Sequence, residues 1–118
     1  MLYRRDKNEK SNIKIDDFVN IVKKTLEDIQ TNLFLEAKNF QVKNTHNVKN
    51  FDEFKTVIEN EGGFIKCGWD GTSETESRIK ELTKATIRVI PFEQDIDRLK
   101  CIYSNKKAKY EVIFAKAY

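Results

Sequence analysis

The feature that most constrains this chain is a stripe of apolar residues with helical spacing in its N-terminal half. The stripe runs over residues 16–43 and comprises Phe18, Val22, Leu26, Ile29, Leu33, Ala37 and Phe40. Because these residues recur every three or four positions, they lie on one face of a single long helix. Asp16 is placed to cap the first turn with its carboxylate. A helix of this kind needs a sheet or a second helix against which to bury its stripe.

The segment before this helix predicts little structure. Leu2 and Tyr3 begin a short apolar opening, and a fully polar run follows from Arg4 to Lys10. We interpret this stub as the end of a strand whose sheet lies elsewhere or as a frayed terminus. A frayed terminus is the simpler expectation for such a polar end of a chain.

Two capping boxes predict two further helices. Asn50 with Glu53 precedes a short apolar helix, which the glycine pair 62–63 ends because glycine tolerates the left-handed conformation of a helix C-terminus. Ser73 with Glu76 opens the next helix in the same way.

Short stretches of alternating or β-branched residues predict the strands. Residues 63–69 alternate in polarity, and residues 86–90 are β-branched and end at a proline. Residues 101–103 and 110–114 are expected to pair as a C-terminal hairpin around the turn 104–107. The predicted fold class is therefore α+β: a small mixed sheet with helices on one face, a long N-terminal helix and a C-terminal hairpin.

The sequence offers no complete catalytic site. The 118 residues suit a single domain, and the net charge of +3 is too mild to indicate nucleic-acid binding by itself. The one histidine, His46, falls in a polar segment, 44–50, that we expect to be a solvated loop. No serine elbow, paired metal-binding histidines or glycine-rich nucleotide loop is present. We therefore expect the chain not to be an enzyme on its own.

Two loops have some capacity to bind anions. The turn 70–73 leads from a strand into a helix, whose free amides could hold a phosphate, although Asp70 would repel it. Lys106, Lys107 and Lys109 form a small basic tip in the predicted hairpin. A solvated turn is the simpler interpretation of this tip, and a contact with RNA phosphates is the alternative.

The cysteines and the lack of long apolar runs indicate the cellular compartment of the protein. Cys67, Cys101 and Asp70 are too few for a structural zinc site, which takes four ligands, and two cysteines make no disulfide framework. No apolar run reaches membrane-spanning length, and no leader is recognisable. We expect a cytoplasmic protein with reduced thiols and no membrane partner.

Two segments nevertheless carry a family resemblance. Residues 63–72, continued by 85–92, form the first, and residues 101–118 form the second. Together they resemble the C-terminal domain of prolyl-tRNA synthetase, of the archaeal- and eukaryote-like type found in some bacteria. The resemblance assigns residues 15–118 to that domain, and residues 1–14 are similar to the end of the anticodon-binding domain that precedes it.

This resemblance implies a role within a class II ligase that attaches proline to tRNA-Pro with ATP. ATP, magnesium and proline would bind a separate catalytic domain, so no cofactor is expected in this chain. The partners would be the catalytic and anticodon-binding domains, with tRNA-Pro bound by the whole enzyme. The domain would be a non-catalytic structural element that packs on the catalytic core, with its terminal residue, Tyr118, near the active site.

The resemblance also implies a metal site that this chain has lost. Many members hold a structural zinc with four cysteines, and the matching positions here are Asp70, Thr75, Cys101 and Ser104. Because one cysteine remains, we expect no zinc, with compensation from a hydrogen bond of Asp70 or from the two capping boxes. The alternative to the whole assignment is a free-standing small RNA-binding module.

Overall fold

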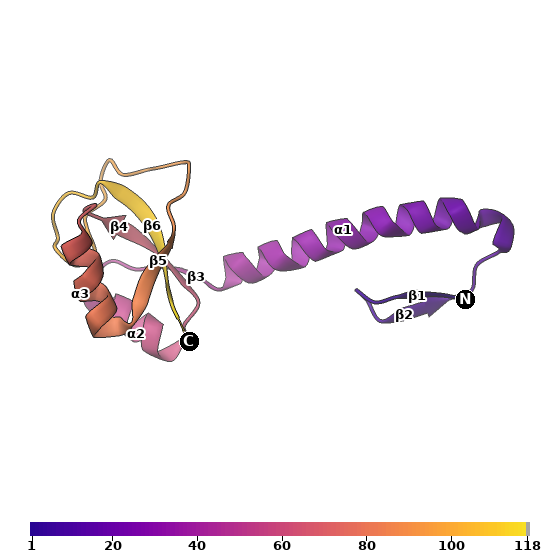
Figure 1. Ribbon diagram of the computed structural model, residues 1–118, viewed down its shortest axis with the longest axis horizontal. Coiled ribbons are helices and arrows are strands. Elements are labelled where there is room, and N and C mark those ends of the chain that lie inside the picture. The colour runs from indigo at the N-terminus through magenta and orange to yellow at the C-terminus, as the bar shows by residue number, and fades with distance from the viewer. Residues whose placement is uncertain (118) are drawn as a thin grey trace. The chain divides into compact units, whose positions relative to one another are not determined.

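The computed structural model describes residues 1–117, so the prediction for Tyr118 lies outside the described residues. The chain forms two compact units, Met1–Lys43 and Asn44–Tyr118, and the boundary between them in the sequence is the end of the long helix (Figure 1). This division follows from the contacts within the chain. The assignment of residues 1–14 to a preceding domain stays a prediction.

The first unit begins with a hairpin, so the expected frayed terminus is wrong. Strand β1 (Leu2–Arg4) pairs antiparallel with strand β2 (Glu9–Ser11). Asn8, with a φ of 56°, takes the left-handed conformation that the tight turn requires. Sequence periodicity missed these strands because three residues are too few to establish alternation.

The predicted long helix is confirmed as α1 (Phe18–Lys43), of 26 residues. Asp16 does not cap it, because Asp16 lies inside a short 3-10 helix (Ile15–Asp17) that leads directly into α1. None of the residues of α1 is buried. Among the described residues, no helix has the length and apolar character needed to span a membrane.

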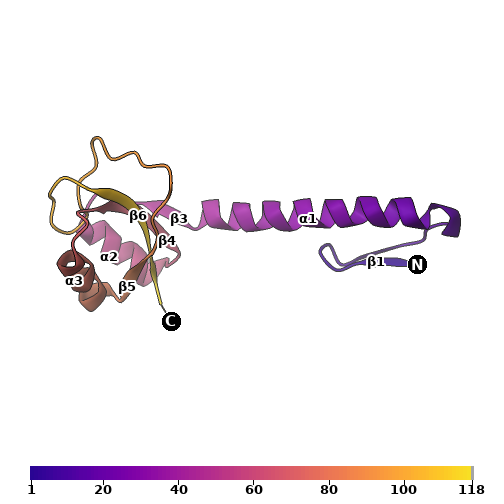
Figure 2. The same cartoon turned by 45° about the horizontal axis from the view of Figure 1, so that its top comes forward.

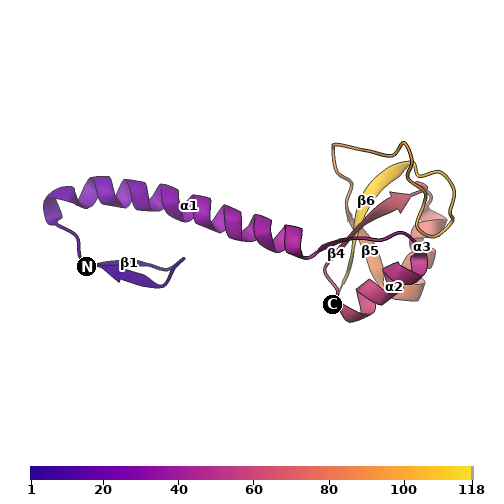
Figure 3. The same cartoon turned by 180° about the vertical axis from the view of Figure 1, so that it is seen from behind.

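The second unit is built on a four-stranded mixed sheet, as predicted (Figures 1 and 3). Its strands are β3 (Thr45–Asn47), β4 (Phe64–Trp69), β5 (Ala85–Val89) and β6 (Tyr110–Lys116), in the spatial order β3-β4-β6-β5. β3 runs parallel to β4, and the other pairs are antiparallel. The expected loop around His46 is therefore partly a strand, formed on the edge of β4 by residues too few and too polar to predict one.

Helices α2 (Phe51–Asn60) and α3 (Ser73–Thr83) cover one face of this sheet (Figure 2). Ile65 in β4 is in register with Phe114 in β6, so both side chains point to the same face. There they meet Phe54 and Ile58 of α2 and Ile79 of α3 in a single buried core. The period-two pattern of β4 and the apolar side of α2 in the sequence both anticipate this arrangement.

The helix caps agree with the prediction at α2 and differ at α3. The Asn50 side chain accepts a hydrogen bond from the Glu53 amide at 2.8 Å, as a capping box requires. At α3 the cap is Thr72, one residue earlier than the expected Ser73, and its hydroxyl accepts from the Thr75 amide. Thr72 is preferred because Asp70 holds its backbone and hydroxyl in place.

The C-terminal strand pair is antiparallel, but its first strand is β5 and not residues 101–103. Both edges of β6 are already occupied, one by β4 and the other by β5. Cys101 instead makes a single parallel bridge to Gly68 of β4, and the Ile102 amide donates to the Gly68 carbonyl at 2.9 Å. The turn at 104–107 exists, within a local loop closed by a bridge between Lys100 and Lys107.

Gly68 allows the loop of residues 99–108 to pack closely against β4. A Cβ atom at this position would lie 2.4 Å from the Lys100 carbonyl oxygen and 2.9 Å from the Ala108 side chain. A side chain would therefore push the loop away from β4. The glycine explains why residues 99–108 lie close to the end of the strand, where the candidate site forms.

Candidate functional site

The predicted site positions meet at the end of β4, around the carboxylate of Asp70. One oxygen, Oδ1, accepts hydrogen bonds from the amide and the hydroxyl of Thr72, at 3.0 and 2.8 Å. The other, Oδ2, accepts from the hydroxyls of Thr75 and Ser104, both at 2.8 Å. We call these four residues the Asp70 cluster. It joins the first turn of α3 to a loop more than 30 residues further along the chain.

The environment of Asp70 favours its ionised form. Partial burial opposes ionisation, but the hydrogen bonds from Thr72, Ser104 and Thr75 outweigh it and lower the pKa of Asp70 to about 2. The carboxylate is therefore charged at neutral pH, and each oxygen is engaged by two donors. A phosphate site at the turn 70–73 stays a prediction, and these contacts disfavour it, since Asp70 and Thr72 already accept from the amides of Thr72 and Thr75.

Cys101, the fourth predicted position, takes part through its backbone. Its amide donates to the Lys106 carbonyl at 2.8 Å, and its carbonyl accepts from the Asn105 amide, which closes the turn that carries Ser104. The side chain is buried, as is that of Cys67. Desolvation, with a smaller effect of Cys101, raises the pKa of Cys67 to about 12, so this thiol stays neutral.

The donor set does not suit a zinc ion. Zinc sites use thiolates, imidazoles and carboxylates, whereas Thr75 and Ser104 offer neutral hydroxyls whose protons are directed at Asp70. Cys67 would have to lose a strongly held proton. Within residues 1–117, no group of three or more His, Cys, Asp and Glu side chains is arranged to hold a metal.

The three lysines of the predicted basic tip do not all lie at the turn. The backbone of Lys106 closes the turn, and Lys107 lies on the bridge to Lys100. Lys109 is past the turn: its amide donates to the Trp69 carbonyl, and its ammonium lies 5.8 Å from the ring centre of Tyr110. An RNA contact of these lysines stays a prediction.

His46 lies apart from the Asp70 cluster in sequence and in its contacts. Its Nδ1 atom is 3.4 Å from a carboxylate oxygen of Glu61, and about a quarter of its side chain is exposed (27%). The expectation of a fully solvated loop histidine is therefore wrong. The signal for this contact was absent from the sequence, because it depends on β3 joining the edge of β4.

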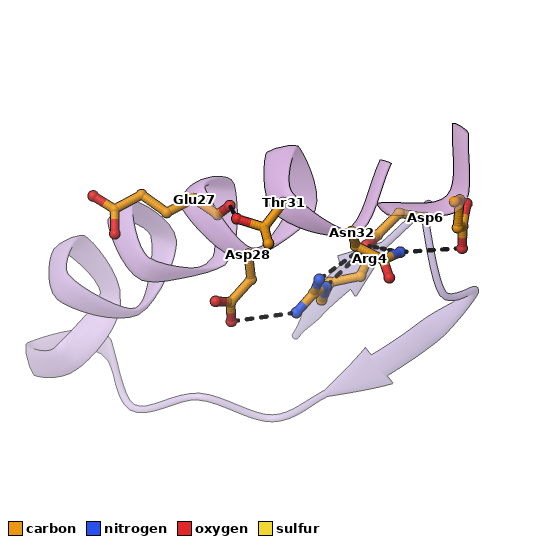
Figure 4. Close-up of polar contacts among 7 residues, drawn as sticks. Arg4, Asp6, Glu27, Asp28, Thr31 and Asn32 are labelled. Carbon is orange, nitrogen blue, oxygen red and sulfur yellow. Dashed lines mark hydrogen bonds and ion pairs between the residues drawn. The ribbon is translucent and has the colours of Figure 1, made fainter. Parts of the chain in front are cut away.

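A second polar cluster, in the first unit, was missed altogether (Figure 4). Arg4 pairs with Asp6 at 2.9 Å and approaches Asp28 of α1 at 3.8 Å. Asn32 of α1 also donates to Asp6, at 3.1 Å. The hydrogen bond from Arg4 raises that residue's pKa and lowers the pKa of Asp6. These contacts hold the hairpin on α1, and the opposite charges of Arg4 and Asp6, two positions apart, were their only trace in the sequence.

Comparison with known proteins decides the family. Residues 51–118 match the family described as prolyl-tRNA synthetase, C-terminal. The chain belongs to this family. It is 44% identical over 117 residues to a proline–tRNA ligase of Amoebophilus asiaticus, covering 99% of the chain and 24% of the ligase. It is 49% identical over 123 residues to the ligase of Chlorobium limicola, covering 98% and 25%.

The match to the ligases extends across both units. A proline–tRNA ligase of Alkaliphilus oremlandii is 45% identical over 118 residues, which is 100% of this chain and 25% of that protein. The chain thus spans about a quarter of the length of the curated relatives that it matches. The resemblance seen in the sequence is confirmed, and the chain corresponds to the C-terminal part of the synthetase.

Proposed function

We propose that the chain serves as the non-catalytic C-terminal region of a proline–tRNA ligase and packs on the rest of that enzyme. The apolar face of α1 carries this proposal. Phe18, Leu26 and Leu33 leave 51%, 60% and 53% of their surface exposed, although they share the stripe that a long amphipathic helix normally buries. The relatives are about four times as long as this chain, so a covering surface is available in the rest of such an enzyme.

The second unit has an apolar segment that supports the same role. Val89, Ile90 and Phe92 follow one another at the end of β5, and the Phe92 side chain is fully exposed. An isolated phenylalanine on a surface needs no explanation, but three large apolar residues within four positions favour a contact surface. The alternative of a free-standing module finds no support in the relatives named above, which are proline–tRNA ligases about four times as long as this chain.

The finer parts of the proposal concern Tyr118, the metal and the partners. We place Tyr118 near the active site of the ligase, with tRNA-Pro bound by the whole enzyme in the cytoplasm. We also propose that the Asp70 cluster replaces a zinc ion. It is supported by the hydrogen bonds that Thr75 of α3 and Ser104 both donate to Asp70, since a structural metal would join the same two segments.

The docking test uses the complete ligase that contains this chain. Leu26→Ser with Leu33→Ser should lower its thermal stability and its proline-dependent ATP–pyrophosphate exchange, because a polar face would dock poorly. Lys23→Gln with Lys24→Gln, on the same helix, is the matched control. Equal behaviour of both double variants would refute docking through this face.

Two further measurements address the finer parts. Removal of Tyr118 from the complete ligase should reduce proline activation, and unchanged adenylate formation would contradict its placement. For the metal, elemental analysis of tag-free chain should find no zinc, and a chelator should leave its melting temperature unchanged. One zinc per chain would overturn the replacement proposal.

A further inference from the structure

The second unit contains a hollow of about 540 Å³ that none of the features above uses. Its walls come from the residues that lead into α2, from the end of β4 and from the loop at 98–105. This loop packs closely against β4 because Gly68 has no side chain. The hydrogen bond from Ser104 to Asp70 holds the same loop in place. The shape of the hollow therefore depends on the close approach at Gly68 and on the hydrogen bond between Ser104 and Asp70.

The charged residues that line the hollow are all basic: Lys49, Arg98 and Lys100. None of the three makes an ion pair within the described part of the chain, whereas Lys66 and Arg78 each have a carboxylate partner. The nearest acidic neighbours in sequence, Asp52, Glu53 and Asp97, do not line it. The Glu53 carboxylate is engaged by the Lys49 amide at 2.8 Å. Three unpaired cations around one hollow favour an anionic occupant.

Aromatic rings form the remaining specific feature of the walls. Tyr103 contacts Phe51 edge to face, with ring centres 5.2 Å apart, and keeps 39% of its surface exposed. Phe51 is itself covered by Lys55, whose ammonium lies 4.9 Å from the ring centre. The Tyr103 ring is thus packed against Phe51 while part of its surface stays accessible to a ligand.

We propose that this hollow binds a nucleotide unit of single-stranded RNA, with phosphates at Lys49, Arg98 and Lys100 and a base stacked on Tyr103. Cations alone would accept any acidic group, but a cationic groove with an exposed aromatic ring suits a phosphodiester strand. The volume lies within the range of small-ligand sites and accommodates one nucleotide. The binding site is distinct from the face of α1 that docks on the ligase, so the two proposals can fail separately.

Fluorescence anisotropy with the 118-residue chain and a labelled single-stranded RNA of about 12 nucleotides tests this site. Arg98→Gln with Lys100→Gln should weaken binding roughly tenfold at about 50 mM salt, because two phosphate contacts are lost. The slope of log affinity against log salt should shrink by about 1.4. Tyr103→Ala should weaken binding about fivefold with an unchanged slope, and Tyr103→Phe should retain it.

The control is Lys23→Gln with Lys24→Gln, which removes the same charge from α1 and should change affinity less than twofold. Circular dichroism melts establish that each variant is folded. Absence of RNA binding by the unmodified chain, or equal losses in the two double variants, would overturn the proposal. Competition by an acidic peptide as strong as that by unlabelled RNA would also overturn it and identify the hollow as a protein contact.

Discussion

The two units differ in where they keep their apolar side chains. The second unit buries Phe54, Ile65 and Phe114 completely between the sheet and helices α2 and α3. The first unit has no buried residue, and α1 leaves Leu26 and Phe34 at least 60% exposed. Each such side chain gains about 1.5–3 kcal/mol on burial, so a closed core stabilises the second unit by itself. The exposed apolar face of the first unit is the surface that we propose docks on the rest of the ligase.

Matched phenylalanine substitutions should show the largest contrast between the units. Phe114→Ala removes a fully buried ring and should lower the free energy of unfolding by about 3–5 kcal/mol. Phe34→Ala, on α1, removes a ring that is 65% exposed and should cost less than about 0.5 kcal/mol. Urea denaturation of the chain measures both. If Phe114→Ala does not fold, Phe114→Leu should show a smaller loss in the same direction. Similar costs at both positions would refute the contrast.

Glycine substitutions sharpen the comparison within the second unit. Gly68→Ala should destabilise the chain by about 2–3 kcal/mol, because its Cβ would meet the Lys100 carbonyl at 2.4 Å. In Gly62→Ala the new Cβ would have no atom within 4 Å, so the free energy of unfolding should fall only because of the φ of +66°, by about 1 kcal/mol. Thermal melts of the two variants show which substitution is the more destabilising. A cost at Gly62 equal to that at Gly68 would contradict the close approach of the loop.

Asp70→Asn tests the cluster that links α3 to the Ser104 loop. The amide keeps one acceptor oxygen in place of two, so unfolding free energy should fall by about 1–2 kcal/mol at pH 7. Asp97→Asn removes an exposed carboxylate and should change it little. Urea denaturation compares the two variants. A loss no larger than that of the control would mean that the cluster does not hold the loop.

The pH dependence of that effect has a defined sign. The folded-state pKa of Asp70, about 2, lies below its ordinary value of 3.8, so the carboxylate stabilises the fold at pH values above 3.8. This contribution is lost as the pH falls toward 2, and the difference between the unmodified chain and Asp70→Asn should narrow in that window. If the stability difference between the two proteins stays constant down to pH 2, the lowered pKa of Asp70 does not stabilise the fold.

The smallest effect is expected at the hairpin of the first unit. Arg4→Gln removes the partly buried contact to Asp6 and the contact to the exposed Asp28, so the loss is confined to the hairpin and its attachment to α1. Amide hydrogen exchange should accelerate in β1 and β2 while β4 and β6 keep their protection, because the units have separate contacts. Lys7→Gln, in the turn of the same hairpin, is the control. Loss of protection in the second unit would show that the two units are coupled.

Local patterns were sufficient wherever a few neighbouring residues determine the outcome. The apolar stripe predicted α1, the Asn50–Glu53 pair predicted the start of α2, and alternation predicted β4. The resemblance also identified Asp70, Thr75 and Ser104 as related positions, and they do meet. The strands β1, β2 and β3 were missed, since three residues carry no periodicity. The basic hollow was missed because Lys49 and Lys100 are far apart in sequence.

Spacing and capping act within one or two turns of the chain, so they were enough to predict the fold class and the main helices, and the resemblance supplied the family. Which segments lie beside β6 depends instead on the tertiary structure. A strand has two edges, and β4 and β5 occupy both, so residues 101–103 lie against Gly68 instead. That placement brings Ser104 to Asp70 and opens the hollow beside Tyr103. Such contacts depend on steric fit between distant segments, which no local pattern encodes.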